Sequence, residues 1–227
     1  MYHRVSRSLA VCIVLFLAHH LVSCDTHPKK PAPSGFSDND FTFKLRSALQ
    51  PFDTTNKKVF RSISEDVRFT YQSDDYQPIW VKQNYRPVGA SERIIAELED
   101  TYWDGLDTAR YQLARLKNLK IRLDTNKVNS VRDAIAFDTL LTRNYLLAAK
   151  ELLIGKVSPK KADSLWYYPN DSIWNAPQLL ISGKKDYPSL SNYRSELPTY
   201  KLLREEYQRY TKLANDSTFL QTIDGIE

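Results

Sequence analysis

Histidine and cysteine are confined to the first residues of this 227-residue chain. All four histidines lie between His3 and His27, and the two cysteines are Cys12 and Cys24. Residues 28–227 therefore contain neither an imidazole nor a thiol. For this part, the absence excludes cysteine nucleophiles, Ser-His-Asp triads, zinc or haem held by His or Cys, and internal disulfides. We expect no metal and no cofactor, and any catalysis there would need carboxylates, Lys, Tyr or Ser alone.

An excess of one charge is also lacking, and glycine is scarce. Residues 24–227 carry 30 Lys and Arg against 27 Asp and Glu, a net charge of +3, which is too small to indicate a nucleic-acid partner. Of the six glycines, Gly105, Gly155 and Gly183 follow apolar periodic segments, where helices commonly end. The apolar fraction of 42% is enough for a packed core.

The amino terminus has the pattern of an export leader. Arg4 and Arg7 precede the apolar run Leu9–Ala18, and residues 21–24 read Leu-Val-Ser-Cys. The run is too short to span a bilayer as a helix and fits a secretory signal segment. The Leu-Val-Ser-Cys segment resembles the bacterial lipobox, whose cysteine becomes the lipid-modified first residue of the mature chain.

We therefore expect a lipoprotein signal peptide over residues 1–23 and a lipid anchor on Cys24. A tether rich in Pro and Lys follows over residues 24–36. One lipidated residue holds a chain on a membrane face rather than threading it through the bilayer. The expected location is the bacterial cell envelope, facing the periplasm, and the sequence leaves open which of the two membranes carries the anchor.

From residue 37 onward the pattern is helical, so we expect an all-α domain over residues 37–227. A first helix is expected over Asp38–Leu49, and a third begins at Ser91 and ends at Gly105. The residues expected to face inward are Phe60, Ile63, Val67 and Tyr71 in the second helix, and Ile94, Ile95, Leu98 and Tyr102 in the third.

The second half of the chain continues this pattern. A short fourth helix is expected from Asp107 or Thr108 to Leu116, and the longest helix from about Val128 to Leu153. Three prolines predict irregular structure over Trp166–Ser189. A final helix begins after Pro198 and frays past Asn215. Its inward residues are expected to be Tyr200, Leu203, Tyr207 and Tyr210. Strand signals are limited to Gln77–Val81.

Four short motifs occur in order on this helical background. They are Tyr76-Gln-Pro-Ile-Trp80; Asp104-Gly-Leu-Asp107 followed by Tyr111; Gly155-Lys-Val-Ser-Pro159; and Leu197-Pro-Thr-Tyr-Lys-Leu-Leu203. Each has a physical interpretation of its own. Pro78 fixes extended backbone, Trp80 supplies a large side chain to bury, and Gly105 permits a left-handed helix cap.

In their order and spacing, these motifs resemble the helical scaffold domain of large bacterial murein L,D-transpeptidases. The resemblance extends over about residues 57–215. It implies an association with peptidoglycan cross-linking. It also assigns structural roles to Tyr76, Pro78, Trp80, Gly105, Leu106, Tyr111, Gly155, Pro198 and Tyr200.

The catalytic residues of that family have no counterpart here. In its full-length members a catalytic domain follows the scaffold, with a His and a Ser-x-Gly-Cys-x-Arg segment whose thiolate attacks the acyl-donor peptide. No cysteine follows Cys24 in this chain, so no residue can take the role of that nucleophile. The expected function is a non-catalytic, membrane-anchored scaffold module that binds peptidoglycan or a cell-wall enzyme.

Two other functions stay open at this point. The chain could be the amino-terminal fragment of a split or truncated L,D-transpeptidase. It could also be a carboxylate-dependent peptidoglycan hydrolase, because such enzymes need only two acids, and Glu97 with Asp100 or Asp104 with Asp107 could supply them. Roles at helix surfaces and caps explain the same acids more simply.

Aromatic residues are abundant, with 14 Tyr and four Trp. Most fall on apolar helix faces, which indicates core packing. One group is different because it lies in the proline-rich stretch, where side chains are more often exposed. Aromatic rings with polar edges stack on sugars, so this group is the candidate surface for glycan or a partner. It consists of Trp166, Tyr167, Tyr168 and Trp174.

Overall fold

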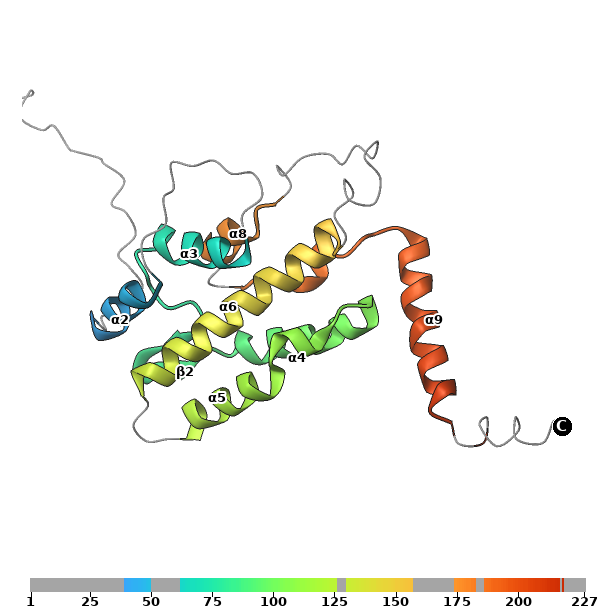
Figure 1. Ribbon diagram of the computed structural model, residues 1–227, viewed down its shortest axis with the longest axis horizontal. Coiled ribbons are helices and arrows are strands. Elements are labelled where there is room, and N and C mark those ends of the chain that lie inside the picture. The colour runs from blue at the N-terminus through green and yellow to red at the C-terminus, as the bar shows by residue number, and fades with distance from the viewer. Residues whose placement is uncertain are drawn as a thin grey trace, which may run out of the picture. The chain divides into compact units, whose positions relative to one another are not determined.

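The computed structural model describes residues 39–49, 62–125, 130–156, 174–182, 186–216 and 218. All of them belong to one compact unit, Phe36–Glu227. These residues form seven α-helices, several short 3₁₀-helices and a single pair of two-residue strands (Figure 1). The expectation of an all-α fold is confirmed.

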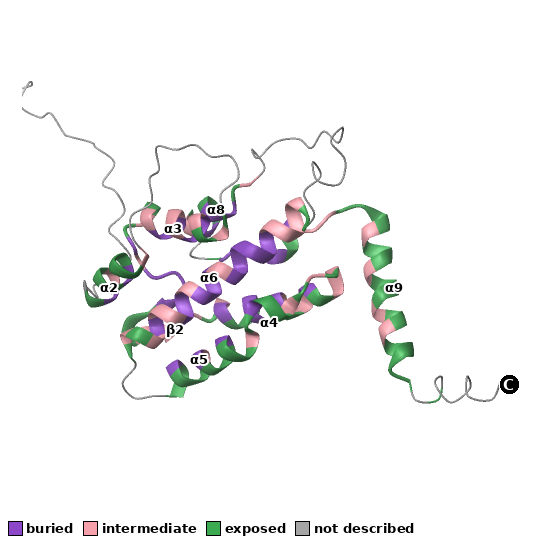
Figure 2. Ribbon diagram, viewed as in Figure 1, coloured by how far each residue is buried: buried purple, intermediate pink, exposed green. Residues whose placement is uncertain are grey.

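Helix α6, Val131–Ile154, is the central element of the domain. Twelve of its residues are buried, which explains why its sequence is apolar over more than one face. The elements that contact it are α2 (Asn39–Leu49), α3 (Ile63–Ser73), α4 (Ala90–Asp100), α5 (Leu113–Thr125), α8 (Ala176–Ser182) and the 3₁₀-helix η5 (Leu190–Tyr193). In Figure 2 the buried residues lie along α6 and on the sides of the helices that face it.

The boundaries of these helices follow from local chemistry. A capping box begins α3, in which the Ser62 hydroxyl accepts from the Glu65 N–H and the Glu65 carboxylate accepts from the Ser62 N–H. The 3₁₀-helix η2, Thr101–Asp104, extends α4 and ends at Gly105, whose φ of 76° is left-handed, as expected for a glycine cap. The carboxylate of Asp107 caps η3, Thr108–Tyr111.

A short hairpin packs against α5 through its second strand. Strand β1, Val81–Lys82, pairs antiparallel with β2, Arg86–Pro87, through the 3₁₀-turn η1, Gln83–Tyr85, so that Val81 lies opposite Pro87. The segment that leads into β1 is the aromatic-x-Pro-aliphatic-Trp motif, and its residues Tyr76, Pro78 and Trp80 are all buried. The N–H groups of Tyr76 and Gln77 donate to the carbonyls of Tyr71 and Asp74, whereas the N–H groups of Ile79, Trp80 and Val81 lie outside any helix and need other partners.

The buried carboxylate of Asp138 on α6 satisfies these N–H groups. It accepts from the backbone N–H of Ile79 (3.1 Å to both oxygens), Trp80 (2.7 Å) and Val81 (3.1 Å). It also accepts from the hydroxyl of Tyr71 on α3 (2.5 Å). One side chain therefore joins α3, the motif segment and α6, and charge-assisted bonds of this kind are stronger than neutral ones.

Trp80 extends the same network. Its indole N–H donates to the hydroxyl of Thr142, one turn along α6 from Asp138, at 3.0 Å. Its ring stacks on Tyr187 with centroids 4.9 Å apart, and the Tyr187 hydroxyl donates to the Ile79 carbonyl at 2.7 Å. Burial, followed by the neighbouring charge of Asp138, raises the pKa of Tyr71 well above its ordinary value.

Three expectations from the sequence are wrong in detail. Tyr102 does not face inward but is 41% exposed. The final helix is α9, Pro198–Ala214, as expected, but it buries none of its residues, and Leu203 and Tyr210 are 71% and 60% exposed. The stretch expected to be irregular contains the helix α8, and Pro177 lies in its first turn, where a missing N–H costs nothing. Phe60 and Gly183 lie outside the described residues.

We predict that Asp138→Asn lowers the free energy of unfolding by about 3 kcal/mol, because the amide offers one acceptor oxygen and turns an NH₂ group toward buried donors. Asp133→Asn is the matched control on the same helix, since Asp133 only forms a surface ion pair with Arg122 and should cost under about 1 kcal/mol. Urea unfolding followed by circular dichroism measures both. Equal losses in the two variants would contradict the role assigned to Asp138.

Candidate interaction site at helix α9

Helix α9 begins with Pro198 as its first residue, a position that suits proline because the first N–H groups of a helix have no intrahelical partner. It contacts η2, the 3₁₀-helix that follows α4. The residues that attach it come from three segments distant in sequence. They are Asp100 and Asp104 from the end of α4 and η2, Arg194 after η5, and Tyr200 and Arg204 from α9.

Asp104 is the centre of this ion cluster, and its side chain is only 1% exposed. Arg194 binds it through Nε at 2.9 and 3.1 Å and through Nη2 at 2.7 Å. Arg204 donates through Nε at 2.9 Å, and the hydroxyl of Tyr200 donates at 2.7 Å. Asp100 accepts from both guanidinium groups, so two carboxylates balance two arginines.

The cluster sets the protonation of its members. Burial raises the pKa of Tyr200 to about 12, and the hydrogen bond to Asp104 and the charge of that carboxylate add to the effect. Burial alone would lower the pKa of Arg194, but the hydrogen bond and charge of Asp104 more than reverse this. Tyr200 is therefore a neutral donor and Arg194 a cation throughout the physiological range.

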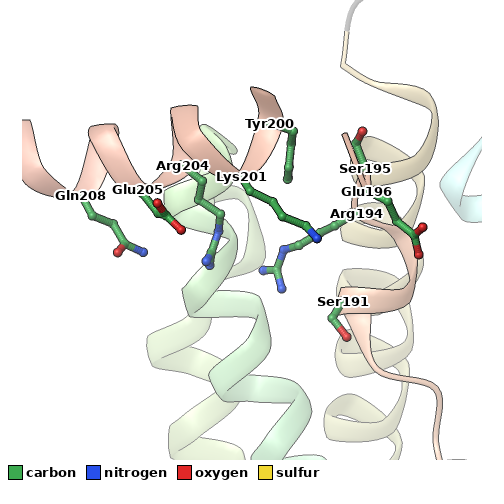
Figure 3. A pocket seen from close by; sticks show the side chains of 9 residues that line it. All are labelled: Ser191, Arg194, Ser195, Glu196, Tyr200, Lys201, Arg204, Glu205 and Gln208. Atoms are coloured by element: carbon green, nitrogen blue, oxygen red, sulfur yellow. The ribbon is translucent and has the colours of Figure 1, made fainter. Parts of the chain in front are cut away.

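A shallow hollow lies between η5 and α9 on the solvent side of the cluster (Figure 3). Arg194 and Arg204 point into it from opposite walls, and Lys201, Glu196 and Glu205 lie around it. Because both arginines already bind Asp100 and Asp104, they offer little free positive charge. The hollow is wide, and both acidic and basic side chains line it. We therefore interpret it as the place where α9 is attached to the domain rather than as a pocket for one small molecule.

A second contact attaches α9 through aromatic rings. The ring centroid of Tyr207 lies 5.7 Å from that of Tyr102 and 5.9 Å from that of Trp103, the last in an edge-on arrangement. Tyr102 and Trp103 belong to η2, so the exposed position of Tyr102 is explained by its contact with α9. Aromatic pairs of this geometry add about 0.5–1.5 kcal/mol each.

Most of α9 is exposed, as the green colouring of the helix in Figure 2 shows, and several of the exposed side chains are large and apolar. Its exposed large side chains are Leu202, Leu203, Tyr207, Tyr210 and Leu213. A contiguous group of this kind on a charged helix is typical of an interaction surface. We call it the α9 apolar face.

The residues assigned by resemblance lie at helix ends and in the segments that connect helices. Tyr76, Pro78 and Trp80 form the segment held by Asp138, and Tyr76 has a positive φ of 58°. Tyr111 is fully buried, and its carbonyl accepts from the side chain of Asn144 on α6 at 2.6 Å. The other assigned residues are Gly105 and Leu106 after η2, Gly155 at the end of α6, and Pro198 and Tyr200 at the start of α9.

The expected glycan surface is described only at Trp174. The indole N–H of Trp174 donates to the buried carboxylate of Asp66 at 3.2 Å, and the ammonium of Lys150 lies 5.4 Å from the ring centre. The ring also packs partly against the core. Trp166, Tyr167 and Tyr168 lie outside the described residues, as do the lipidation candidate Cys24 and the motif residue Pro159.

The acid pairs considered for hydrolysis have other partners in this structure. Glu97 pairs with Arg93 and accepts from the Leu190 N–H, Asp107 caps η3, and Asp100 and Asp104 hold the two arginines. Across the described residues, no group of three His, Cys, Asp or Glu side chains is arranged to hold a metal ion. In the same residues, no helix has both the length and the apolar character needed to cross a membrane.

Sequence reasoning missed the roles of Asp138 and Asp104, which bind segments distant in sequence. Asp138 is an acid inside an apolar helix, and its distance of 58 residues from Trp80 leaves no trace in local spacing. The sequence offers Asp104 as part of the Gly105 motif and as a hydrolase acid paired with Asp107, not as the centre of an ion cluster. The available signal was two arginines, Arg194 and Arg204, placed just before and just after the Pro198 helix start.

We predict that Asp104→Asn releases α9, because two partly buried guanidinium groups lose the carboxylate that neutralises them. Hydrogen exchange in Pro198–Ala214 should rise at least about tenfold, and unfolding should become easier by about 2 kcal/mol. Asp107→Asn, three residues away, is the control, and it should change stability by less than about 1 kcal/mol, because Asn caps helices as well as Asp, without altering exchange in α9. Unchanged exchange in the Asp104 variant would show that the cluster does not attach the helix.

Comparison with known proteins places this arrangement in a family. A family model described as a Scaffold domain matches residues 65–206, well over half of the chain. No curated protein and no solved structure gives a match. The matched range begins in the capping box of α3, ends within α9, and includes Asp138, Trp80 and the ion cluster of Asp104. The chain thus belongs to the Scaffold domain family, which is consistent with the resemblance of its motifs to the scaffold domain of L,D-transpeptidases.

Proposed function

We propose that this protein is a non-catalytic, membrane-anchored scaffold module of peptidoglycan cross-linking, which binds the cell wall or a wall enzyme. The observation that carries the proposal is the Scaffold domain match over residues 65–206, in a chain whose residues 28–227 contain neither Cys nor His. Thiol-dependent acyl exchange needs a thiolate, and residues 28–227 contain no cysteine to supply one. This supports a role in holding other molecules.

The use of the charged residues supports a holding role. The charged residues that connect the elements already have partners. Asp104 forms ion pairs with Arg194 and Arg204, and Asp138 accepts hydrogen bonds from the backbone. A catalytic acid or base instead needs a reactive atom within reach and a pKa suited to proton transfer. A scaffold needs a stable core and an accessible surface, and the domain combines a core around α6 with the exposed helix α9.

The amino-terminal pattern supports a place at the membrane. A leader over residues 1–23 and a lipid on Cys24 would put the domain on the periplasmic side, with residues 24–36 as the tether. Peptidoglycan lies in the same compartment. The tether of 13 residues would reach at most about 45 Å when extended, so the scaffold would work near the membrane surface.

We predict that the mature protein binds wall material without altering it. Purified sacculi should retain it in a sedimentation assay, or wall enzymes should co-purify with it from solubilised envelopes. Muropeptide dimers incubated with it should remain unchanged. The Asp104→Asn variant should lose several-fold in retention or in co-purified enzyme, while Asp107→Asn should not, because only the first change releases α9. Turnover of muropeptide dimers by the pure protein, or the absence of binding in both assays, would refute the proposal.

A separate prediction concerns the anchor. Cys24→Ala should abolish incorporation of radiolabelled palmitate and move the protein from the membrane fraction to the periplasmic or unprocessed fraction. Cys12→Ala is the matched control, because Cys12 lies within the proposed leader and should leave labelling unchanged. Full labelling of the Cys24 variant would rule out this residue as the lipid site.

A further inference from the structure

Exposed apolar side chains gather on one helix. Among the described residues ten large hydrophobic side chains are exposed, and five of them lie on α9, with Leu197 immediately before it. Leu202 is 58%, Leu203 is 71% and Tyr210 is 60% exposed. Scattered exposed leucines are common, but a helix that concentrates them has an unoccupied partner surface.

Apart from Tyr207, which packs on Tyr102 and Trp103, the apolar residues of α9 lie on a different side from the residues that bind Asp104. Leu203, Glu206, Tyr210 and Leu213 follow a three- and four-residue spacing, which places them on one stripe of the helix. Tyr200 and Arg204 point toward Asp104 on a different side. The attachment of α9 to its own domain therefore leaves this stripe free for another helix.

The charges on the stripe are self-complementary only in one orientation. Glu206 lies within it and Arg209 at its edge, and in the single chain they bind each other at 2.6 and 2.9 Å. If a second α9 were parallel, Glu206 would face Glu206 and Arg209 would face Arg209. An antiparallel second α9 instead brings each Glu206 next to the partner's Arg209, twice, about a two-fold axis.

The leucines fit the same alignment. An antiparallel pair centred near Gln208 places Leu203 opposite the partner's Leu213, and it does so at both ends of the contact. Tyr210 then lies next to the partner's Glu206 and can cover it. Antiparallel helices also place their dipoles favourably, whereas parallel ones do not. The contact is isologous, as in most two-fold dimers, because one surface meets its own copy.

We propose that the α9 apolar face binds a second copy of this chain, forming an antiparallel α9–α9 dimer. The dimer joins two scaffold domains through their most exposed helix and leaves α6 and the Asp138 network untouched. This inference does not depend on peptidoglycan binding, because it rests on the geometry and charges of α9 alone. Retention by sacculi and dimerisation are therefore tested by separate experiments.

Site-specific cross-linking of the full chain in its own membranes tests the orientation. Leu203→Cys and Leu213→Cys are expressed together on differently tagged copies and treated with a short thiol-specific cross-linker. The antiparallel pair predicts mixed 203–213 dimers. Each variant expressed alone should give only the background of the unmodified chain, because equivalent positions are separated by about 15 Å along the axis. Cross-linking of Leu203→Cys with itself, or no cross-linking in any combination, would overturn the proposal.

Charge variants identify the partner. With the cysteine pair in place, Glu206→Arg on both copies should lower cross-linking about tenfold, since two attractive pairs become repulsive. Combining a Glu206→Arg copy with an Arg209→Glu copy should restore it. Leu179→Glu, at an exposed leucine of α8, is the control and should have no effect.

If the α9 apolar face bound a membrane instead of a second copy, Glu206→Arg would strengthen binding rather than weaken it. Anionic vesicles of phosphatidylglycerol should bind the Glu206→Arg protein more tightly than the parent if the α9 apolar face lies on lipid. Stronger vesicle binding with unchanged cross-linking would overturn the dimer. Loss of cross-linking in Glu206→Arg, with recovery in the mixed pair, supports it.

Discussion

The fold of this domain depends on one buried carboxylate. Asp138 lies in the first half of α6 and accepts hydrogen bonds from the backbone N–H groups of Ile79, Trp80 and Val81, together with the hydroxyl of Tyr71. A non-helical segment cannot enter a helical core unless its backbone groups find partners, and an unsatisfied buried N–H costs about 1–3 kcal/mol. Because Asp138 supplies these partners, Trp80 can be fully buried among helices and stack on Tyr187. The motif Tyr76-Gln-Pro-Ile-Trp80 is thus the insertion that Asp138 holds in place.

The attachment of α9 also depends on a buried carboxylate, which in this case binds two arginines. Asp104 is the last residue of η2, which ends at the Gly105 cap, and it binds Arg194 and Arg204 on the two sides of the Pro198 helix start. The consequence is a long surface helix fixed at one end by charge and at its side by Tyr102 and Trp103, with its apolar face directed to solvent. Membership of the Scaffold domain family agrees with such a division between a rigid interior and an exposed helix. The role of that helix at the cell wall is our proposal.

Much of this architecture could be predicted from the sequence because it is local. Three- and four-residue spacing gave the helices α2, α3, α4, α6 and α9 within a few residues, and Gly105 and Pro198 marked an end and a beginning. The failures have a common cause, since a periodic apolar pattern shows that a face is apolar but not that it is covered. Leu203, Tyr207 and Tyr210 were therefore assigned to the core although they are exposed. Asp138 and the pairing of Asp104 with Arg204 depend on contacts across 58 and 100 residues, which spacing does not record.

The most direct measurement of the central claim is residue-resolved amide hydrogen exchange by NMR. If the Asp138 carboxylate holds the motif segment, the amides of Ile79, Trp80 and Val81 exchange only on global unfolding, at the same free energy as the core amides of α6. Exchange of these three amides at the rate of ordinary loop residues, while α6 stays protected, would contradict the account.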